Sequence, residues 1–139
     1  MIYIDTGPFV ARYLRRDQYH QLALKAWKYL DRQPWRCYTS SFVLAETFTL
    51  LARRASYQFA AQRARSILMS AELEILQPTF EDELKAVSFF EKFADQSVSF
   101  VDCISFVLMQ KKKIRRAFSF DRHFSLAGFK CWPEEVKLV

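Results

Sequence analysis

Short apolar runs that alternate with amphipathic segments constrain the fold of this chain more than any other feature. Four such runs, at residues 1–4, 37–39, 73–77 and 117–120, have the length and character of buried strands. A short edge strand is expected from residue 129 onward. Because strands that alternate with helices form parallel sheets covered on both faces, we predict an α/β fold. The expected architecture is a three-layer α/β/α sandwich with a central, mainly parallel sheet of about four or five short strands.

The segments between these runs have the apolar spacing of helices. Thr79-x-x-Asp82 resembles a capping box, the signature of a helix start. Asp5-Thr6-Gly7-Pro8 is expected to form a turn after the first strand. No linker or internal repeat divides the sequence, so we expect a single domain over residues 1–139. The predicted helices cover about residues 9–14, 17–32, 41–51, 57–69, 79–93 and, starting at Ser97 or Ser99, a segment that ends near residue 111.

The scarcity of glycine excludes two classes of nucleotide-binding site. The chain contains only Gly7 and Gly128, so neither GxGxxG nor GxxxxGK[ST] can be written in it. Each of these motifs needs clustered glycines to bring the backbone close to phosphate. A dinucleotide fingerprint and a P-loop are therefore both ruled out.

The cysteines and the apolar runs indicate the compartment. Cys37, Cys103 and Cys131 are odd in number and offer no CxxC or Cys/His zinc spacing, so we expect reduced, buried thiols. No segment has the shape of a signal peptide, and no uncharged run approaches the roughly 18 residues of a membrane span. We therefore expect a soluble, cytoplasmic protein with no membrane partner.

An excess of positive charge points to an acidic partner such as nucleic acid. The chain has 21 Lys and Arg against 15 Asp and Glu, a net charge of +6 and a pI near 9.4. Any one of the basic clusters, taken alone, is usually only a solvated face. Their closeness in sequence to candidate site residues nevertheless favours attraction of phosphate, and Tyr13 and Tyr19 are candidates for stacking on bases. The clusters are Arg12/Arg15/Arg16, Arg53/Arg54 and Lys111–Lys113 with Arg115/Arg116.

Four carboxylates lie among apolar neighbours, where an ionised acid is costly unless it is paired or binds a metal. Asp5 and Asp121 each follow an apolar strand, so both should lie at the carboxyl edge of the sheet, where open α/β sheets bind ligands. Glu46 and Asp102 lie near the starts of predicted helices that can face the same crevice. Four converging acids would repel one another and need a cation. Oxygen ligands alone favour Mg²⁺ or Mn²⁺ over zinc.

Each of these acids also has an ordinary structural explanation. Asp102 can be the third-position partner of Ser99 in a capping box. Asp5 and Asp121 can be turn residues at strand ends, and Glu46 can hydrogen-bond a core group. These explanations account poorly for all four acids together.

The residues around the four acids resemble the PIN domain, and among its members the VapC-type toxins of bacterial toxin–antitoxin pairs. The resemblance extends from Met1 to the segment after the last motif. One departure is Gly7, which stands where the family often has serine. The matching segments are Ile4-Asp5-Thr6-Gly7, Ser41-Phe42-Val43-Leu44-Ala45-Glu46, Phe100-Val101-Asp102-Cys103-Ile104-Ser105-Phe106 and Phe118-Ser119-Phe120-Asp121-Arg122-His123-Phe124.

The resemblance implies a PIN-like sandwich and a Mg²⁺- or Mn²⁺-dependent endoribonuclease that hydrolyses RNA phosphodiester bonds. Asp5 and Asp102 correspond to the main direct ligands, Glu46 to a ligand that binds directly or through water, and Asp121 to a peripheral one. Thr6 matches a hydroxyl that supports the site. His123, two residues after Asp121, either contacts substrate or shapes the loop.

The resemblance further implies a toxin that forms a homodimer and is neutralised by a small protein antitoxin. That antitoxin would place a helix in a groove and a basic residue near the carboxylates. Two other functions remain open at this point. One is a non-catalytic RNA-binding or scaffolding module of the same fold, which four intact acids argue against. The other is a DNA-directed nuclease.

Overall fold

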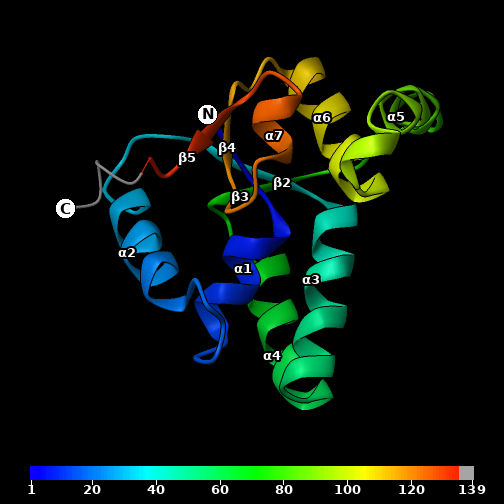
Figure 1. Cartoon of the computed structure of the whole chain (residues 1–139). Helices are drawn as coiled ribbons and strands as arrows, with labels where there is room; N and C mark the ends of the chain where they lie inside the picture. The colour runs from blue at the N-terminus through cyan, green and yellow to red at the C-terminus, as the bar shows by residue number, and fades with distance from the viewer. Residues whose placement is uncertain (135–139) are drawn as a thin grey trace.

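Five short parallel strands form the central sheet of this protein (Figure 1). The structure is a computed structural model that describes residues 1–134, so the last five residues of the predicted domain lie outside the described residues. Each pair of neighbouring strands is parallel, and the strand order is β3-β2-β1-β4-β5. The predicted parallel sheet, including its last edge strand, is confirmed. The strands are β1 (Ile2–Ile4), β2 (Cys37–Ser40), β3 (Leu73–Leu76), β4 (Arg116–Phe118) and β5 (Lys130–Trp132).

Helices cover the sheet on both sides (Figure 1). Helices α1, α2 and α4 lie on one side and α6 and α7 on the other, while α3 contacts α1, α4 and α6. None of the described helices is long and apolar enough to cross a membrane. The bounds are α1 (Thr6–Tyr13), α2 (His20–Leu30), α3 (Ser41–Arg54), α4 (Tyr57–Leu68), α5 (Phe80–Lys92), a 3-10 turn η1 (Ala94–Gln96), α6 (Phe100–Lys112) and α7 (His123–Leu126).

Hydroxyl side chains cap the starts of four of the described helices, one of them Ser56 at α4. Thr79 and Asp82 form the predicted capping box at α5, with each side chain bonded to the other's backbone N–H. Ser99 caps α6, which decides between the two serines considered from the sequence; Ser97 instead has a left-handed backbone (φ 56°). Ser40 caps α3 by accepting a hydrogen bond from the N–H of Val43 at 3.1 Å.

The predicted turn after the first strand is wrong. Helix α1 starts directly at Thr6, and Pro8 lies in its first turn. A proline is tolerated there because the first N–H groups of a helix have no intrahelical partner. Strand β4 also ends at Phe118, two residues earlier than predicted, and α7 and η1 were not predicted.

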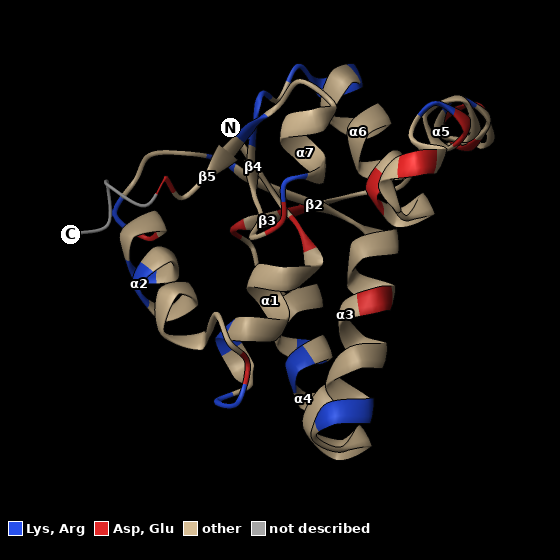
Figure 2. Ribbon diagram, in the orientation of Figure 1, with Lys and Arg blue, Asp and Glu red and all other residues tan. Residues whose placement is uncertain are grey.

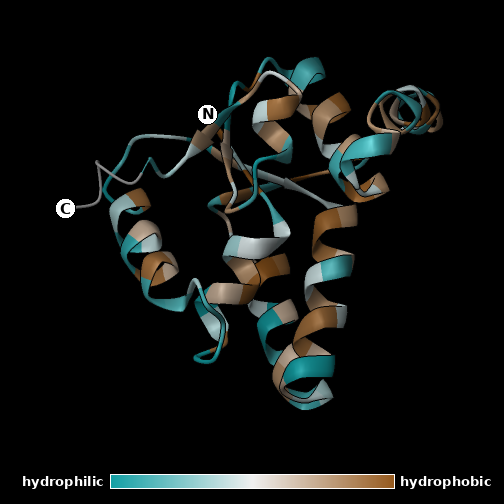
Figure 3. Cartoon of the chain, viewed as in Figure 1, coloured by the Kyte–Doolittle hydropathy of each residue, from teal (hydrophilic) through white to brown (hydrophobic). Residues whose placement is uncertain are grey.

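Aromatic side chains fill the core on both sides of the sheet. On one side Phe118 of β4 packs against Trp27 of α2, with ring centroids 5.2 Å apart. On the other side Phe106 of α6 meets Phe124 of α7 edge to face at 5.2 Å. Figure 3 shows hydrophobic segments along the inner helix faces of both layers. The central sheet is therefore packed between aromatic side chains on both of its faces.

Candidate active site

The candidate site lies at the carboxyl ends of two neighbouring central strands, β1 and β4, whose following connections lead to opposite halves of the sheet. Strands β1 and β4 are neighbours, but the chain continues from β1 toward β2 and β3 and from β4 toward β5 on the opposite side. In parallel α/β sheets such a topological switch point leaves a crevice at the carboxyl ends of the strands. Asp5 directly follows β1, and Ser119 and Asp121 follow β4. The predicted placement of both aspartates at this edge agrees with the fold.

Asp5 is buried and is not used to cap its helix. It occupies the N-cap position of α1, yet its carboxylate makes no capping bond. Instead, its Oδ2 accepts a hydrogen bond of 3.0 Å from the hydroxyl of Ser119. Burial, followed by the charges of Asp102 and Asp121, raises the pKa of Asp5 well above its usual range. The carboxylate is thus held in place, and none of the ion pairs among residues 1–134 includes it.

Asp102 has the capping role considered from the sequence, and it also contacts the loop after β4. Its Oδ2 accepts the N–H of Ser99 at 3.3 Å, which completes the capping box of α6. The same oxygen lies 2.9 Å from Nδ1 of His123, whose ring N–H can donate to it. Burial and then the charge of Asp121 raise the pKa of Asp102, although the contact with His123 opposes the shift.

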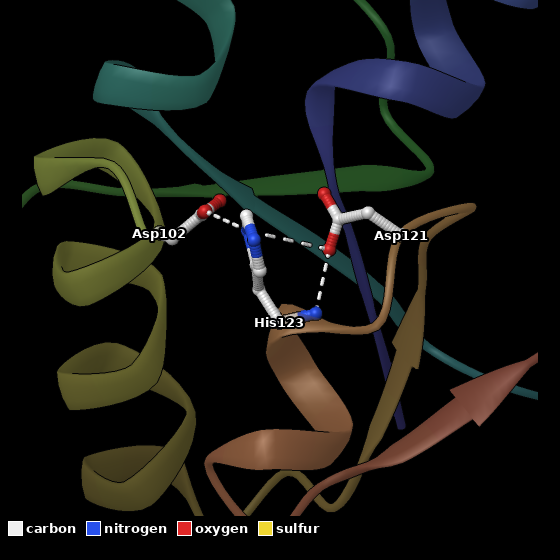
Figure 4. A group of neighbouring side chains, drawn as sticks. All are labelled: Asp102, Asp121 and His123. Carbon is white, nitrogen blue, oxygen red and sulfur yellow. Dashed lines mark hydrogen bonds and ion pairs between the residues drawn. The ribbon is translucent and has the colours of Figure 1, made fainter. Parts of the chain in front are cut away.

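Asp121 and His123 complete the cluster from the loop after β4 (Figure 4). Oδ1 of Asp121 accepts the backbone N–H of His123 at 2.9 Å and lies 3.7 Å from its ring Nδ1. One ligand atom each from Asp102, Asp121 and His123 lies within 4.8 Å of the others. His123 was considered from the sequence only as a loop or substrate residue. Its contact with Asp102 comes from the packing of α7 against α6, which no local sequence pattern reports.

The donor set fits a hard divalent cation. Asp102 and Asp121 bring carboxylate oxygens, the ligands that Mg²⁺ and Mn²⁺ prefer, close together, and Asp5 lies near enough for their charges to raise its pKa. The Oγ1 of Thr6, which follows Asp5, is buried and has no hydrogen-bond partner among the described residues. The raised pKa values of Asp5 and Asp102, together with an unsatisfied hydroxyl beside them, favour a positively charged ligand.

Glu46 lies beside this cluster rather than inside it. It is half-buried on α3 and lines a cleft of about 610 Å³ together with Ser41, Phe42 and Val101. Val101 directly precedes Asp102, so this cleft reaches the start of α6. Within residues 1–134, no hydrogen bond links Glu46 to the other three acids. Its role as a metal ligand stays a prediction.

The chain belongs to the PIN domain family, whose model matches residues 2–130. A curated relative is the 23S rRNA-specific endonuclease VapC20 of Mycobacterium tuberculosis. It is 36% identical over 129 residues, which cover 93% of this chain and 95% of VapC20. The crystal structure of that protein, described as a Sarcin-Ricin loop cleaving toxin, superposes with a TM-score of 0.84 at 35% identity. This match covers 93% of this chain and 96% of the other.

More distant solved structures share the fold. FitAcB from Neisseria gonorrhoeae has a TM-score of 0.65 at 13% identity and covers 96% of this chain and 97% of its own. VapBC-1 from nontypeable Haemophilus influenzae has a TM-score of 0.65 at 12% identity and covers 94% and 96%. The predicted PIN-like α/β/α fold and the relationship to VapC-type endoribonuclease toxins are thereby confirmed.

Proposed function

We propose that this protein is a cytoplasmic, metal-dependent endoribonuclease that cuts RNA, with ribosomal RNA as the substrate class. The observation that supports it most directly is the convergence of Asp5, Asp102 and Asp121 at the switch point of the sheet, with the pKa values of the two buried acids, Asp5 and Asp102, raised. The relationship to a 23S rRNA-specific endonuclease over 93% of the chain supports the choice of RNA.

In this proposal Asp5 and Asp102 are the main ligands of Mg²⁺ or Mn²⁺, with Asp121 and Glu46 at the periphery and Thr6 in support. When held by these residues, a metal ion would activate water for attack on the phosphodiester and would stabilise negative charge in the transition state. The chain's own residues hold the ligands in place. Loss of a residue that hydrogen-bonds a metal ligand typically lowers metal affinity or activity by about 10–100-fold, and two residues have that position here. They are Ser119, which donates to Asp5, and His123, which lies against Asp102.

A cleavage assay tests the proposal directly. Purified protein is incubated with ribosomal RNA and with single-stranded DNA, each with Mn²⁺ and with EDTA. We expect RNA fragments that EDTA suppresses, and little cleavage of DNA. Preferential cleavage of DNA, or binding of RNA without any cleavage, would replace the proposal with one of the other two functions considered from the sequence.

We further propose that the protein forms a homodimer through an apolar face of α5. Phe80, Leu84, Val87 and Phe90 recur at helical spacing, and their side chains are 74%, 55%, 41% and 47% exposed. Apolar side chains gathered in this way on one face typically mark an interaction surface. The ring of Phe90 also meets that of Phe100 at the start of α6, at 5.7 Å, so the face extends toward the active site.

A small protein antitoxin is the other proposed partner. A cleft of about 740 Å³ reaches from α1 and α2 to α4 and β3, and its lining includes the rings of Phe9, Trp27 and Trp35. Asp31 and Glu72 are at the same cleft, a combination suited to a peptide with apolar and basic side chains. Co-expression with the product of a short neighbouring reading frame tests this: we expect a stable complex in which RNA cleavage is suppressed.

A further inference from the structure

A third cleft, at the far end of α1 from the carboxylates, concentrates positive charge. It has a volume of about 500 Å³ and lies where the loop after α1 meets the end of α3 and the start of α4. Figure 2 shows basic residues on this loop, at the end of α3 and along α4. The residues that matter for its chemistry are Tyr13, Arg15, Arg16, Asp17, Arg54 and Phe59.

Two of the arginines in this cleft are free to bind a ligand. Arg15 and Arg16 are exposed, and none of the ion pairs in the described part of the chain includes them. The one acid at the cleft, Asp17, is already engaged. Its Oδ1 accepts the backbone N–H of Tyr19 at 2.9 Å, and its Oδ2 lies 3.4 Å from Nη1 of Arg54. The cleft therefore has three guanidinium groups and a single carboxylate, which already accepts a hydrogen bond and pairs with Arg54.

Two aromatic side chains, Tyr13 and Phe59, form part of the wall of the cleft. Tyr13 and Phe59 meet edge to face with centroids 6.5 Å apart. The guanidinium of Arg63 lies 5.6 Å from the ring of Tyr13 and 5.1 Å from that of Phe59, which adds a fourth positive charge behind the rings. Arginines beside aromatic rings are the usual composition of a surface that binds single-stranded nucleic acid, since the cations attract phosphate and the rings stack on bases.

The position of the cleft relates it to the active site. Helix α1 begins next to Asp5 and ends at Tyr13, eight residues that span about 12 Å at 1.5 Å per residue. On the neighbouring helix α3, Glu46 and Arg54 are separated by the same distance of about 12 Å. A strand of RNA with one phosphate at the carboxylates can therefore reach the cleft within a few nucleotides.

We propose that this arginine cleft binds a phosphodiester group of the RNA substrate, a few nucleotides away from the bond that is cut. The inference rests on the proposed endoribonuclease function and adds a second point of contact for the same substrate. An acidic protein segment is the competing ligand. The aromatic wall and the short path along α1 to the carboxylates favour RNA.

The test compares two double variants that remove the same charge. Arg15→Ala/Arg16→Ala empties the cleft of its free cations, and Lys28→Ala/Arg32→Ala removes two exposed cations at the end of α2. Binding of a single-stranded RNA from the cleaved region is measured in an Asp5→Asn background, so that the RNA stays intact. We expect the cleft variant to lower affinity about tenfold and to reduce the slope of log K against log salt by about 0.7 for each lost phosphate contact. In the active enzyme the loss should appear in KM rather than in kcat.

Equal affinity and equal salt dependence of the two double variants would overturn the inference. So would a cleft variant that binds RNA normally but no longer binds a small acidic protein partner. Failure of the proposed function is a separate result, because it appears as an absence of RNA cleavage by the unmodified protein with Mn²⁺.

Discussion

The carboxylate of Asp102 accepts hydrogen bonds from two parts of the chain that the sequence separates. Ser99 precedes it within the same helix turn, and His123 follows it after a further strand and loop. The first contact orients the start of α6, and the second fixes the carboxylate relative to Asp121. Geometry at this residue is thus determined jointly by a local and a distant partner.

Replacement of Asp5 by Asn should separate activity from folding. Because the side chain is buried among other acids, we expect loss of RNA cleavage by at least about 100-fold but a higher melting temperature in metal-free buffer. Cleavage rates and thermal melting in EDTA measure both effects. Asp95→Asn removes the same charge from an exposed turn and serves as the control. A variant that unfolds would mean that Asp5 is structural.

The raised pKa values of Asp5 and Asp102 predict a pH dependence with a definite sign. In the unfolded chain both ionise near the usual aspartate value of about 3.9, whereas the folded chain retains their protons to higher pH. The folded state is therefore destabilised as the pH rises from that value through the raised pKa values. In EDTA, the melting temperature of Asp5→Asn should exceed that of the unmodified protein by a margin that grows with pH. Saturating Mn²⁺ should reduce this margin, and a pH-independent margin would contradict the assignment.

His123 should act on metal binding through Asp102. We expect His123→Ala to weaken Mn²⁺ binding by about 10–100-fold, since the ring no longer positions the carboxylate. Calorimetric titration of Mn²⁺ measures this without reference to cleavage. The exposed neighbour Arg122, changed to Ala, should leave Mn²⁺ affinity as it is.

At the scale of single elements, two similar capping boxes lie at different distances from the site. Thr79 caps α5, and Ser99 caps α6 beside Asp102. Either residue changed to Ala should lower the free energy of unfolding by about 1 kcal/mol, as measured by urea denaturation. Only Ser99→Ala should also reduce RNA cleavage, because it loosens the turn that holds Asp102. Equal activity of the two variants would show that the cap and the site are independent.

Local patterns predicted most of the elements and left two features of the site unpredicted. The acids at strand ends and the capping boxes are encoded within a few residues, so Asp5, Asp102 and Asp121 could be grouped from the sequence. The helix start at Thr6 was missed because proline and glycine in a first turn look like a turn signal. The contact of His123 with Asp102 and the offset position of Glu46 depend on how helices pack, which spacing alone does not report.

At the scale of the whole molecule, the proposed dimer face can be tested by a substitution that introduces one charged side chain. Leu84→Glu places a carboxylate in the middle of the apolar face of α5, where its burial in a dimer would be costly. We expect this variant to be monomeric in sedimentation equilibrium. Leu68→Glu on α4 is a close control, because the two leucines are 55% and 54% exposed. A monomeric unmodified protein, or an unchanged dimer in both variants, would contradict the proposal.

The charge of the molecule is divided more sharply than its net value suggests. If the four predicted ligands are left out of the count, the rest of the chain has 21 basic residues and 11 acidic ones. Figure 2 shows acidic positions at the start of α1 and basic ones at its far end. Such a division draws a polyanion to the surface while leaving the acidic pocket for the cation.

The bond between Ser119 and Asp5 joins residues that are 114 positions apart. During synthesis at roughly 5–20 residues per second, about 6–23 s pass between the addition of Asp5 and that of Ser119. Asp5 is therefore synthesised well before Ser119, its hydrogen-bond partner. A protein that cuts ribosomal RNA, as proposed, would thus lack the hydrogen bond that holds Asp5 until Ser119 has been added.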